Sequence, residues 1–247
     1  MLLLIDAGNT RIKWALLLED AGLGIWQASG ALFHAELDAL ATILAKHQPR
    51  RAWVSNVAGA TIRSQLDVLL RASGIPNDSV HWFRSQAQCA GVMNGYRDPS
   101  QLGCDRFASL IGARALFPEQ SLLVITAGTA TTIDALDVSG RFLGGMILPG
   151  LGTMAQSLAL STAQLPHVEA HLSVSRFADN TLDAIVSGCM QAQLGAIMQA
   201  RVQLPEAVCV LSGGAAEYLL PYVPAPVQQV EHLVLRGLQV AALSESS

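Results

Sequence analysis

Two similar stretches of this chain have the composition of phosphate-binding turns. Residues 2–10 (LLLIDAGNT) are echoed by residues 122–130 (LLVITAGTA), and five of the nine aligned positions are identical. In each stretch an apolar run that predicts a buried strand ends in a small turn with a glycine, which leaves backbone N–H groups pointing outward, toward phosphate oxygens. Two such turns predict two related half-molecules that bind one polyphosphate.

Asp6, at the end of the first apolar run, is the first candidate for chemistry. An Asp beside Gly-Asn is also a common turn former. Because four apolar residues precede Asp6, we expect a buried carboxylate, which costs energy unless hydrogen bonds, cations or metal-bound water compensate. Near a nucleotide, Asp6 would hold Mg²⁺-bound water. Lys13 either approaches the phosphates as a point charge or lies in solvent at a strand edge.

A second candidate lies at residues 102–106 (LGCDR), where a loop is expected to enter a helix. One interpretation is a solvated helix start, since the helix dipole favours Asp in the first turn. In the functional interpretation, Asp105 accepts a proton from a substrate hydroxyl, Arg106 binds a substrate carboxylate and Gly103 allows close approach. An acid beside a guanidinium suits a hydroxy acid.

Strands and helices must alternate to position these residues. The apolar patterns, Gly turns and Pro breaks predict strands at 2–5, 13–18, 51–57, 80–83, from 121, 131–136, 142–148 and 207–211, and helices at 37–46, 61–73, 105–117, 151–160, 181–201 and 230–243. Such interleaving is typical of an α/β fold. We expect a boundary near residues 118–120, with halves at 1–118 and 119–247.

Composition excludes several classes of protein. Of the 247 residues, 51% are hydrophobic and 14% charged, which excludes a disordered chain. The net charge of −4 includes only 15 Lys and Arg residues, and these form no basic run, so we expect no nucleic-acid partner. No apolar segment approaches the roughly 18 residues of a membrane span. We therefore expect a cytoplasmic protein without a membrane partner.

Metal and cofactor motifs are also missing from the sequence. Cys89, Cys104, Cys189 and Cys209 form no C-x-x-C pair, so reduced structural thiols are expected. The six histidines have no metal-binding spacing and are expected on the surface or in packing; they are His34, His47, His81, His167, His171 and His232. Neither a P-loop nor a G-x-G-x-x-G motif is present.

Taken together, the motifs closely resemble those of the type III pantothenate kinases. The resemblance is carried by residues 6–10 (DAGNT), 94–99 (NGYRDP), 103–106 (GCDR), 128–134 (GTATTID), 144–150 (GGMILPG), 180–181 (NT) and 212–214 (SGG). Each motif alone is weak. Their order and spacing over nearly the whole chain are specific.

The resemblance implies a duplicated actin-like fold (ASKHA, ribonuclease H-like) with an interdomain cleft, and it implies a homodimer. It also implies the activity: phosphorylation of pantothenate by ATP to 4'-phosphopantothenate, the first step towards coenzyme A. By position, the first phosphate loop is Asp6, Ala7, Gly8, Asn9, Thr10, Arg11, Ile12 and Lys13. Thr129 contacts ATP, and Asp105 is the proton acceptor. Pantothenate is bound by Tyr96, Gly103, Cys104, Asp105 and Arg106, with Thr181 reaching it from the other subunit.

Thr126 departs from the family pattern. The family has at this position an Asp that coordinates a monovalent cation, whereas this chain has a hydroxyl. A hydroxyl ligates K⁺ or NH₄⁺ weakly and adds no formal charge. We therefore expect no strong monovalent-cation requirement, while ATP with Mg²⁺ remains expected.

Two other functions stay open at this point. The first is a regulatory protein with an ATP cleft and little kinase activity, similar to the related Bvg accessory factor proteins. The second is an actin-fold kinase for another hydroxy acid or sugar. An assay for pantothenate-dependent ADP release distinguishes a regulatory protein from a pantothenate kinase. A panel of acceptor alcohols distinguishes a pantothenate kinase from a kinase for another hydroxy acid or sugar.

Overall fold

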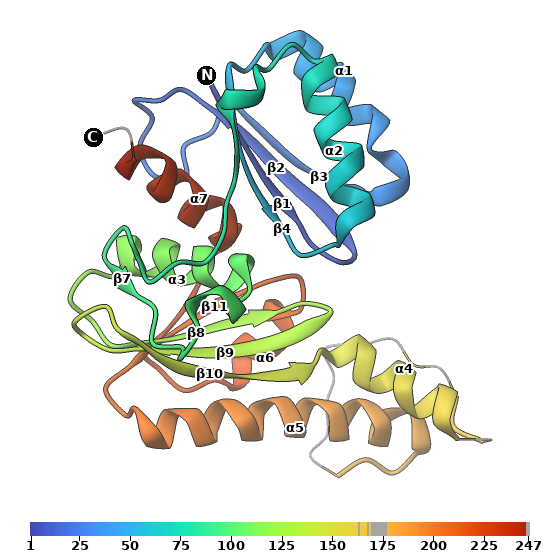
Figure 1. Ribbon diagram of the computed structural model, residues 1–247. Helices are drawn as coiled ribbons and strands as arrows, with labels where there is room; N and C mark the ends of the chain where they lie inside the picture. The colour runs from blue at the N-terminus through green and yellow to red at the C-terminus, as the bar shows by residue number, and fades with distance from the viewer. Residues whose placement is uncertain (163, 167, 169–176, 246–247) are drawn as a thin grey trace. The chain divides into compact units, whose positions relative to one another are not determined.

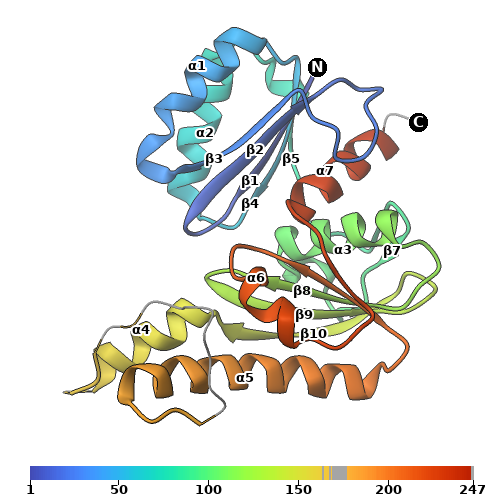
Figure 2. The same cartoon turned by 180° about the vertical axis from the view of Figure 1, so that it is seen from behind.

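The computed structural model describes residues 1–162, 164–166, 168 and 177–245 (Figures 1 and 2). By its internal contacts the chain forms two compact units. Unit 1 comprises Met1–Pro118 together with the C-terminal segment from His232, and unit 2 comprises Glu119–Glu231. Among the described residues, no helix is both long and apolar enough to cross a membrane.

Unit 1 is built on a five-stranded sheet with strand order β3-β2-β1-β4-β5. Its strands are β1 (Leu2–Ala7), β2 (Arg11–Leu17), β3 (Ala28–Phe33), β4 (Arg51–Asn56) and β5 (Val80–Trp82). The central strand β1 runs antiparallel to β2 and parallel to β4. All six of its residues are buried, as the unbroken apolar run predicted for a strand covered on both faces.

Helices cover both faces of this sheet. One face packs against α1 (Asp38–His47) and α2 (Ala60–Ala72), whose buried residues recur at helical spacing, as Leu40 and Leu44 do in α1. The other face contacts α7 (Leu233–Ser244), which packs in turn on α3 (Cys104–Leu116). The remaining elements of unit 1 are η1 (His34–Glu36), η2 (Asn77–Ser79), β6 (Gln88–Cys89), β7 (Val92–Met93) and η3 (Pro99–Gln101).

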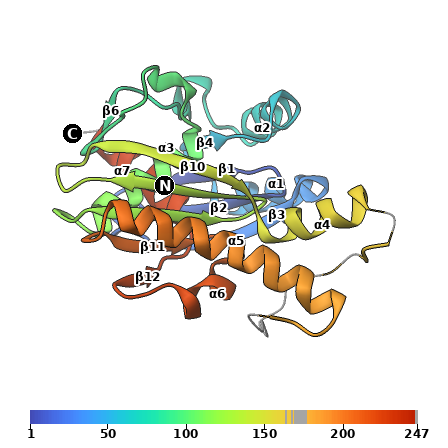
Figure 3. The same cartoon turned by 90° about the horizontal axis from the view of Figure 1, so that it is seen from below.

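Unit 2 repeats the same topology, with strand order β10-β9-β8-β11-β12. Its elements are β8 (Leu122–Ala127), β9 (Ala130–Leu136), β10 (Phe142–Pro149), α4 (Leu151–Ser161), α5 (Thr181–Gln203), β11 (Val208–Ser212), α6 (Ala216–Leu219), η4 (Leu220–Tyr222) and β12 (Val227–Gln229). Helix α5 lies along one face of the sheet (Figure 3) and packs against alternate residues of β8. The matching strand orders establish the duplicated α/β architecture that the repeated motif predicted.

The C-terminal helix differs from the sequence-based expectation, which grouped it with the second half. In the structure α7 packs on α3 of unit 1. Two glycines permit this close contact: a Cβ on Gly237 would overlap the carbonyl of Ala108, and a Cβ on Gly112 would lie 2.6 Å from the carbonyl oxygen of Leu233. Apolar periodicity identifies a helix but does not identify the helix on which it packs.

Strand β3 was missed because its sequence has a weak strand pattern. Its first four residues, ASGA, are small, and none of the six is fully buried. The strand forms an edge of the sheet, pairs with β2, and brings Gly30 against the indole of Trp14. Backbone hydrogen bonds to a single neighbouring strand are enough to form an edge strand. The pattern of hydrophobic side chains therefore need not indicate it.

Candidate active site

The site in unit 1 begins with the sheet face on which Asp6 lies. Asp6 pairs in register with Lys13 on β2 and with Ser55 on β4. Residues paired in this way point to the same face of a sheet. The neighbouring Ile5 and Ala7 belong to the core with α1 and α2, so Asp6 points to the opposite face, where α3 and α7 pack. Its exposed fraction is only 8%.

The N-terminus of α3 is fixed to the end of β4 by a thiol. The Cys104 Sγ lies 3.3 Å from the Ser55 Oγ and 3.7 Å from the carbonyl oxygen of Asn56. Burial raises the pKa of the Cys104 thiol, which keeps it neutral. The next residue along the helix is Asp105, whose Oδ1 accepts a hydrogen bond from the Arg106 backbone N–H at 2.8 Å. Cys104 therefore positions Asp105 beside the strand ends.

Asp6 is buried and Asp105 is half-buried, and the charge of Asp105 acts on the Asp6 carboxylate. Burial raises the pKa of Asp6 to about 7, the charge of Lys13 opposes this shift, and the charge of Asp105 adds to it. Burial also raises the pKa of Asp105, against the opposing effects of the Arg106 backbone N–H and guanidinium. Two desolvated acids that repel each other favour a proton or a cation between them. This donor set fits a hydrated divalent cation.

Tyr96 contacts Arg106, the residue that follows Asp105. The Arg106 guanidinium donates a hydrogen bond from Nη1 to the Tyr96 hydroxyl at 3.1 Å, and it lies 5.8 Å from the centre of the Tyr96 ring. The Asn94 side chain shapes the loop by accepting from the Tyr96 N–H at 3.1 Å and donating to the carbonyl of Pro99 at 3.0 Å. The turn residues of the NGYRDP motif thus bring Tyr96 to Arg106.

The first glycine turn joins β1 to β2. The Gly8 N–H donates to the Arg11 carbonyl at 3.1 Å, and Asn9, Thr10 and Arg11 are exposed. The His34 Nε2 lies 2.9 Å from the Gly8 carbonyl oxygen and holds this turn from η1. Sequence reasoning assigned His34 only to the surface or to packing. It lies 26 residues from Gly8, and no local motif links the two positions.

The second glycine turn, between β8 and β9 of unit 2, is held by two other glycine segments. The Thr129 carbonyl accepts hydrogen bonds from the Gly150 N–H at 2.9 Å and the Thr153 hydroxyl at 2.7 Å. A Cβ on Gly150 would overlap the Gly128 carbonyl, and a Cβ on Gly213 would overlap the carbonyl of Ala127. The glycine-rich segments at 150 and 213 therefore define the shape of the turn that carries Thr129.

Thr126 lies in a row of three hydroxyl residues. It pairs in register with Thr132 on β9 and with Ser212 on β11. Within the described part of the chain, the buried Thr132 Oγ1 has no hydrogen-bond partner. The row offers neutral oxygen ligands and no carboxylate. Among the described residues, no three or more His, Cys, Asp or Glu side chains come together in a group that could hold a metal ion.

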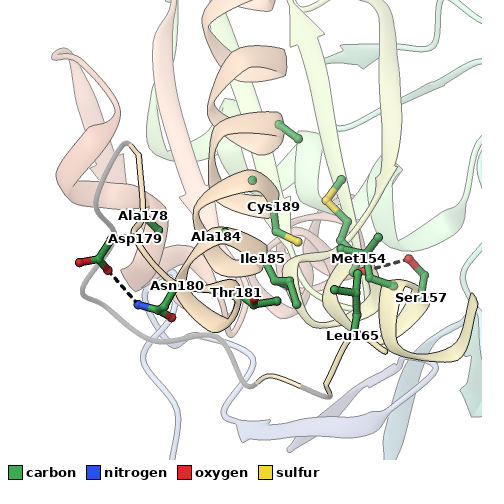
Figure 4. A pocket seen from close by; sticks show the side chains of 13 residues that line it. Met154, Ser157, Leu165, Ala178, Asp179, Asn180, Thr181, Ala184, Ile185 and Cys189 are labelled. Atoms are coloured by element: carbon green, nitrogen blue, oxygen red, sulfur yellow. Dashed lines mark hydrogen bonds between the residues drawn. The ribbon is translucent and has the colours of Figure 1, made fainter. Parts of the chain in front are cut away.

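Thr181 is the first residue of α5, after the helix cap Asn180, whose Oδ1 accepts from the Asp183 N–H at 3.0 Å. Thr181 is exposed and lines a cavity of about 770 Å³ between α4 and α5 (Figure 4). Thr126, Thr129 and Thr181 all belong to unit 2, whereas the acids, Lys13, Tyr96 and Arg106 belong to unit 1.

Comparison with known proteins defines the family. A family model described as type III pantothenate kinase matches residues 2–202. The protein named type III pantothenate kinase in Janthinobacterium sp. (strain Marseille) is 48% identical over 258 residues, covering 100% of this chain and 99% of its own. The protein of the same name in Aromatoleum aromaticum is 48% identical over 252 residues, with both chains fully covered. The chain belongs to the type III pantothenate kinase family.

Solved structures support the fold of this type III pantothenate kinase family member. A Campylobacter jejuni protein, described as a candidate Baf family transcriptional activator, has a TM-score of 0.61 at 18% identity and covers 99% of this chain and 100% of its own. A candidate 2-dehydro-3-deoxygalactonokinase of Sinorhizobium meliloti has a TM-score of 0.60 at 15% identity, with 100% and 99% covered. Together with the repeated sheet, these similarities establish the duplicated actin-like fold.

Other sequence-based expectations have mixed outcomes. The four cysteines are unpaired; Cys89, Cys189 and Cys209 are buried and Cys104 is half-buried. His81 stacks on Trp53 with ring centres 3.9 Å apart, which is the packing role expected of it. His167 and His171 lie outside the described residues.

Proposed function

We propose that this chain transfers the γ-phosphoryl group of ATP to the primary hydroxyl of pantothenate, giving 4'-phosphopantothenate in the first step of coenzyme A biosynthesis. The observation that carries the proposal is the cluster of Asp105, Asp6 and Lys13 in unit 1, in a chain 48% identical over its whole length to a protein named for this activity. The kinase name of the relatives does not favour the regulatory alternative. A cytoplasmic location is part of the proposal.

Asp105 is proposed as the general base. Its raised pKa makes it a better proton acceptor than an ordinary carboxylate, while the Arg106 N–H and guanidinium limit that shift and keep the ionised form available. The fixed position of α3 through Cys104 and Ser55 would orient the carboxylate toward the substrate hydroxyl. Tyr96 and Arg106, with the backbone at Gly103 and Cys104, would bind the rest of pantothenate, with Arg106 on its carboxylate.

ATP is proposed to contact both glycine turns. In unit 1 the contacts would come from residues 6–13, with the exposed residues 9–11 at the turn and the Lys13 ammonium as a point charge for the phosphates. In unit 2 Thr129 contacts the nucleotide. When bound, Mg²⁺ neutralises charge on the transferring phosphates. Asp6, as a buried acid next to Asp105, would hold its hydrated shell.

Monovalent cations are proposed to be dispensable. The row of Thr126, Thr132 and Ser212 supplies hydroxyl oxygens only. A K⁺ or NH₄⁺ ion there would gain weak neutral ligands and no compensating charge. We therefore propose that Thr126 contributes at most a weak monovalent-cation site.

The active form is proposed to be a homodimer in which Thr181 contacts the pantothenate of the other subunit. Support comes from Thr181, which is exposed and lines a cavity, and from the exposed apolar side chains of Leu158, Leu160 and Leu182 in α4 and α5, which a second copy would cover.

A mixing experiment tests this shared site. Asp105→Asn and Thr181→Ala chains should each be weakly active alone, whereas co-refolded mixtures should regain activity, because half of the sites in a mixed dimer combine a native Asp105 with a native Thr181. Simple addition of the two residual activities would contradict the shared site.

A coupled assay tests the proposed reaction directly. The wild-type chain should release ADP only when pantothenate is present. Asp105→Asn should keep the fold and the nucleotide affinity but lower kcat by roughly 10²-fold or more, the usual scale of a general base. Asp20→Asn, which removes an exposed carboxylate of unit 1, serves as the matched control. Near-native turnover by Asp105→Asn would reject the assignment.

A further inference from the structure

A cavity in unit 1 adjoins α3, the helix that carries Asp105. Its volume is about 380 Å³, and it lies between the end of β4, the first turn of α2 and the segments that precede α3. Two arginines, Arg63 and Arg84, line it together with Ser85 and Ser100, and none of its lining residues is acidic. A concave site with two guanidinium groups and no acid attracts anions.

Neighbouring acids do not neutralise these arginines. Asp67, one turn along α2 from Arg63, is paired with Arg71 at 2.8 Å. Arg63 instead lies over the ring of Trp82, with its guanidinium carbon 4.3 Å from the ring centre. This stacking orients the group without neutralising its charge. Within the described ranges, neither Arg63 nor Arg84 forms an ion pair, and Arg84 is exposed to solvent.

The carboxylate of Asp98 is hydrogen-bonded to Ser100, one of the residues that line the cavity. Asp98 Oδ1 accepts hydrogen bonds from the Ser100 hydroxyl at 2.7 Å and from the Ser100 N–H at 3.0 Å, and these bonds lower the pKa of Asp98. The hydroxyl of Ser85, another lining residue, donates a hydrogen bond to the Gly103 carbonyl at 3.4 Å. The serine hydroxyls thus brace the loop before α3, and the two arginines remain available to a ligand.

We infer that this cavity is an oxyanion subsite, in which Arg63 and Arg84 bind the carboxylate or phosphate of a small polar molecule. The cavity is continuous with the catalytic helix because Gly103 and Cys104 line it, directly before Asp105. Tyr96 and Arg106 do not line it, so it is distinct from their cluster. The planar guanidinium of arginine forms paired hydrogen bonds with carboxylates and phosphates alike. The ligand is therefore either a separate anion, which leaves the pantothenate carboxylate on Arg106, or that carboxylate itself, which rests on the proposed function and would replace Arg106 in this role.

Binding of inorganic phosphate tests the subsite without any turnover. Phosphate should raise the melting temperature of the wild-type chain saturably. The Arg63→Ala and Arg84→Ala variants should each weaken this binding by roughly tenfold or more, the usual effect of losing a charged hydrogen-bond donor. Arg50→Ala, which removes an exposed arginine of the same unit outside the cavity, should behave as wild type.

Steady-state kinetics then identify the source of the anion. If the subsite holds the acceptor's carboxylate, Arg84→Ala should raise KM for pantothenate about tenfold and leave KM unchanged for the analogue in which a hydroxymethyl group replaces the carboxylate. If it holds a separate anion, both KM values stay at wild-type level while phosphate binding is lost. Either pattern supports the subsite.

Two results would overturn the inference. One is unchanged phosphate stabilisation together with an unchanged KM for pantothenate in both arginine variants. The other is an equal loss for both acceptors accompanied by a lower melting temperature, which would make the arginines structural. Failure of the wild-type chain to phosphorylate pantothenate would reject the proposed function alone, since the phosphate titration still decides the subsite.

Discussion

Asp6 on β1 stands directly opposite Lys13 on β2, in antiparallel register and on the sheet face that points toward α3. The ammonium of Lys13 only partly offsets the cost of burying the Asp6 carboxylate beside a second acid, and the pKa of Asp6 rises to about 7. Without nucleotide or metal, this acid therefore carries a proton at mildly acidic pH.

The first prediction concerns the effect of Asp6 on stability. Between pH 3.8, its ordinary pKa, and pH 7, the folded chain keeps a proton that the unfolded chain releases. The free energy of unfolding therefore falls as pH rises through this window. In metal-free buffer at pH 8, Asp6→Asn should be more stable than wild type, on the order of 2–4 kcal/mol at about 1.4 kcal/mol per pKa unit. At pH 5 the gain should be much smaller. Urea melts at both pH values measure it, and an equal difference at the two would count against the burial of Asp6.

The second prediction compares two glycines at the start of α4. The backbone angles of Gly150 suit any residue, but a Cβ there would overlap the Gly128 carbonyl and approach the Thr129 carbonyl at 2.8 Å. Gly150→Ala should displace the second turn, cost about 1–3 kcal/mol and raise KM for ATP about tenfold. A Cβ on Gly152 meets nothing within 4 Å, so Gly152→Ala is the control. Equal KM values for the two variants would show that the turn does not contact ATP.

The third prediction concerns Thr126. Replacing Na⁺ with K⁺ should change wild-type turnover by less than about twofold, whereas Thr126→Asp should gain roughly tenfold on addition of K⁺, because the new carboxylate requires a counter-ion. Melting temperature gives a second readout, since K⁺ should stabilise the Asp variant only. Strong K⁺ activation of the wild-type chain would instead mean that the row of hydroxyls formed with Thr132 and Ser212 suffices as a cation site.

The fourth prediction tests the helix contact that completes unit 1. Gly237→Ala should destabilise the chain by about 3 kcal/mol or more, because the added methyl group overlaps the Ala108 carbonyl of α3. Gly195→Ala, in the interior of α5 with nothing within 4 Å of its Cβ, should stabilise by about 0.5–1 kcal/mol through helix propensity. The midpoints of urea unfolding measure both changes. A mild effect at Gly237 would mean that α7 can shift away from α3.

The repeated turn was predictable because local chemistry encodes it. Apolar runs that end in Asp6-Ala7-Gly8 and Thr126-Ala127-Gly128 mark the central strand of each sheet, and the two sheets share one strand order. The helix that carries Asp105 was likewise evident from its apolar pattern. The strands, their turns and this helix are each determined mainly by residues close together in the sequence.

Features that depend on distant contacts were not predictable. The hydrogen bond between His34 and Gly8 joins residues 26 positions apart, and the contact of Gly237 with Ala108 joins α7 to α3 although the whole of unit 2 separates them in sequence. The interaction between Asp6 and Asp105 could be predicted only in part. Asp6 and Asp105 each stood out from local sequence, but only the fold determines that one raises the pKa of the other.

Because α7 follows the whole of unit 2 in sequence, a ribosome that has made residues 1–231 has already produced every strand and every proposed catalytic side chain. The partner of α3, however, has not yet been translated. The nascent protein therefore holds the helix of Asp105 with one flank uncovered until α7 emerges, and we expect competence for catalysis to arise only after that.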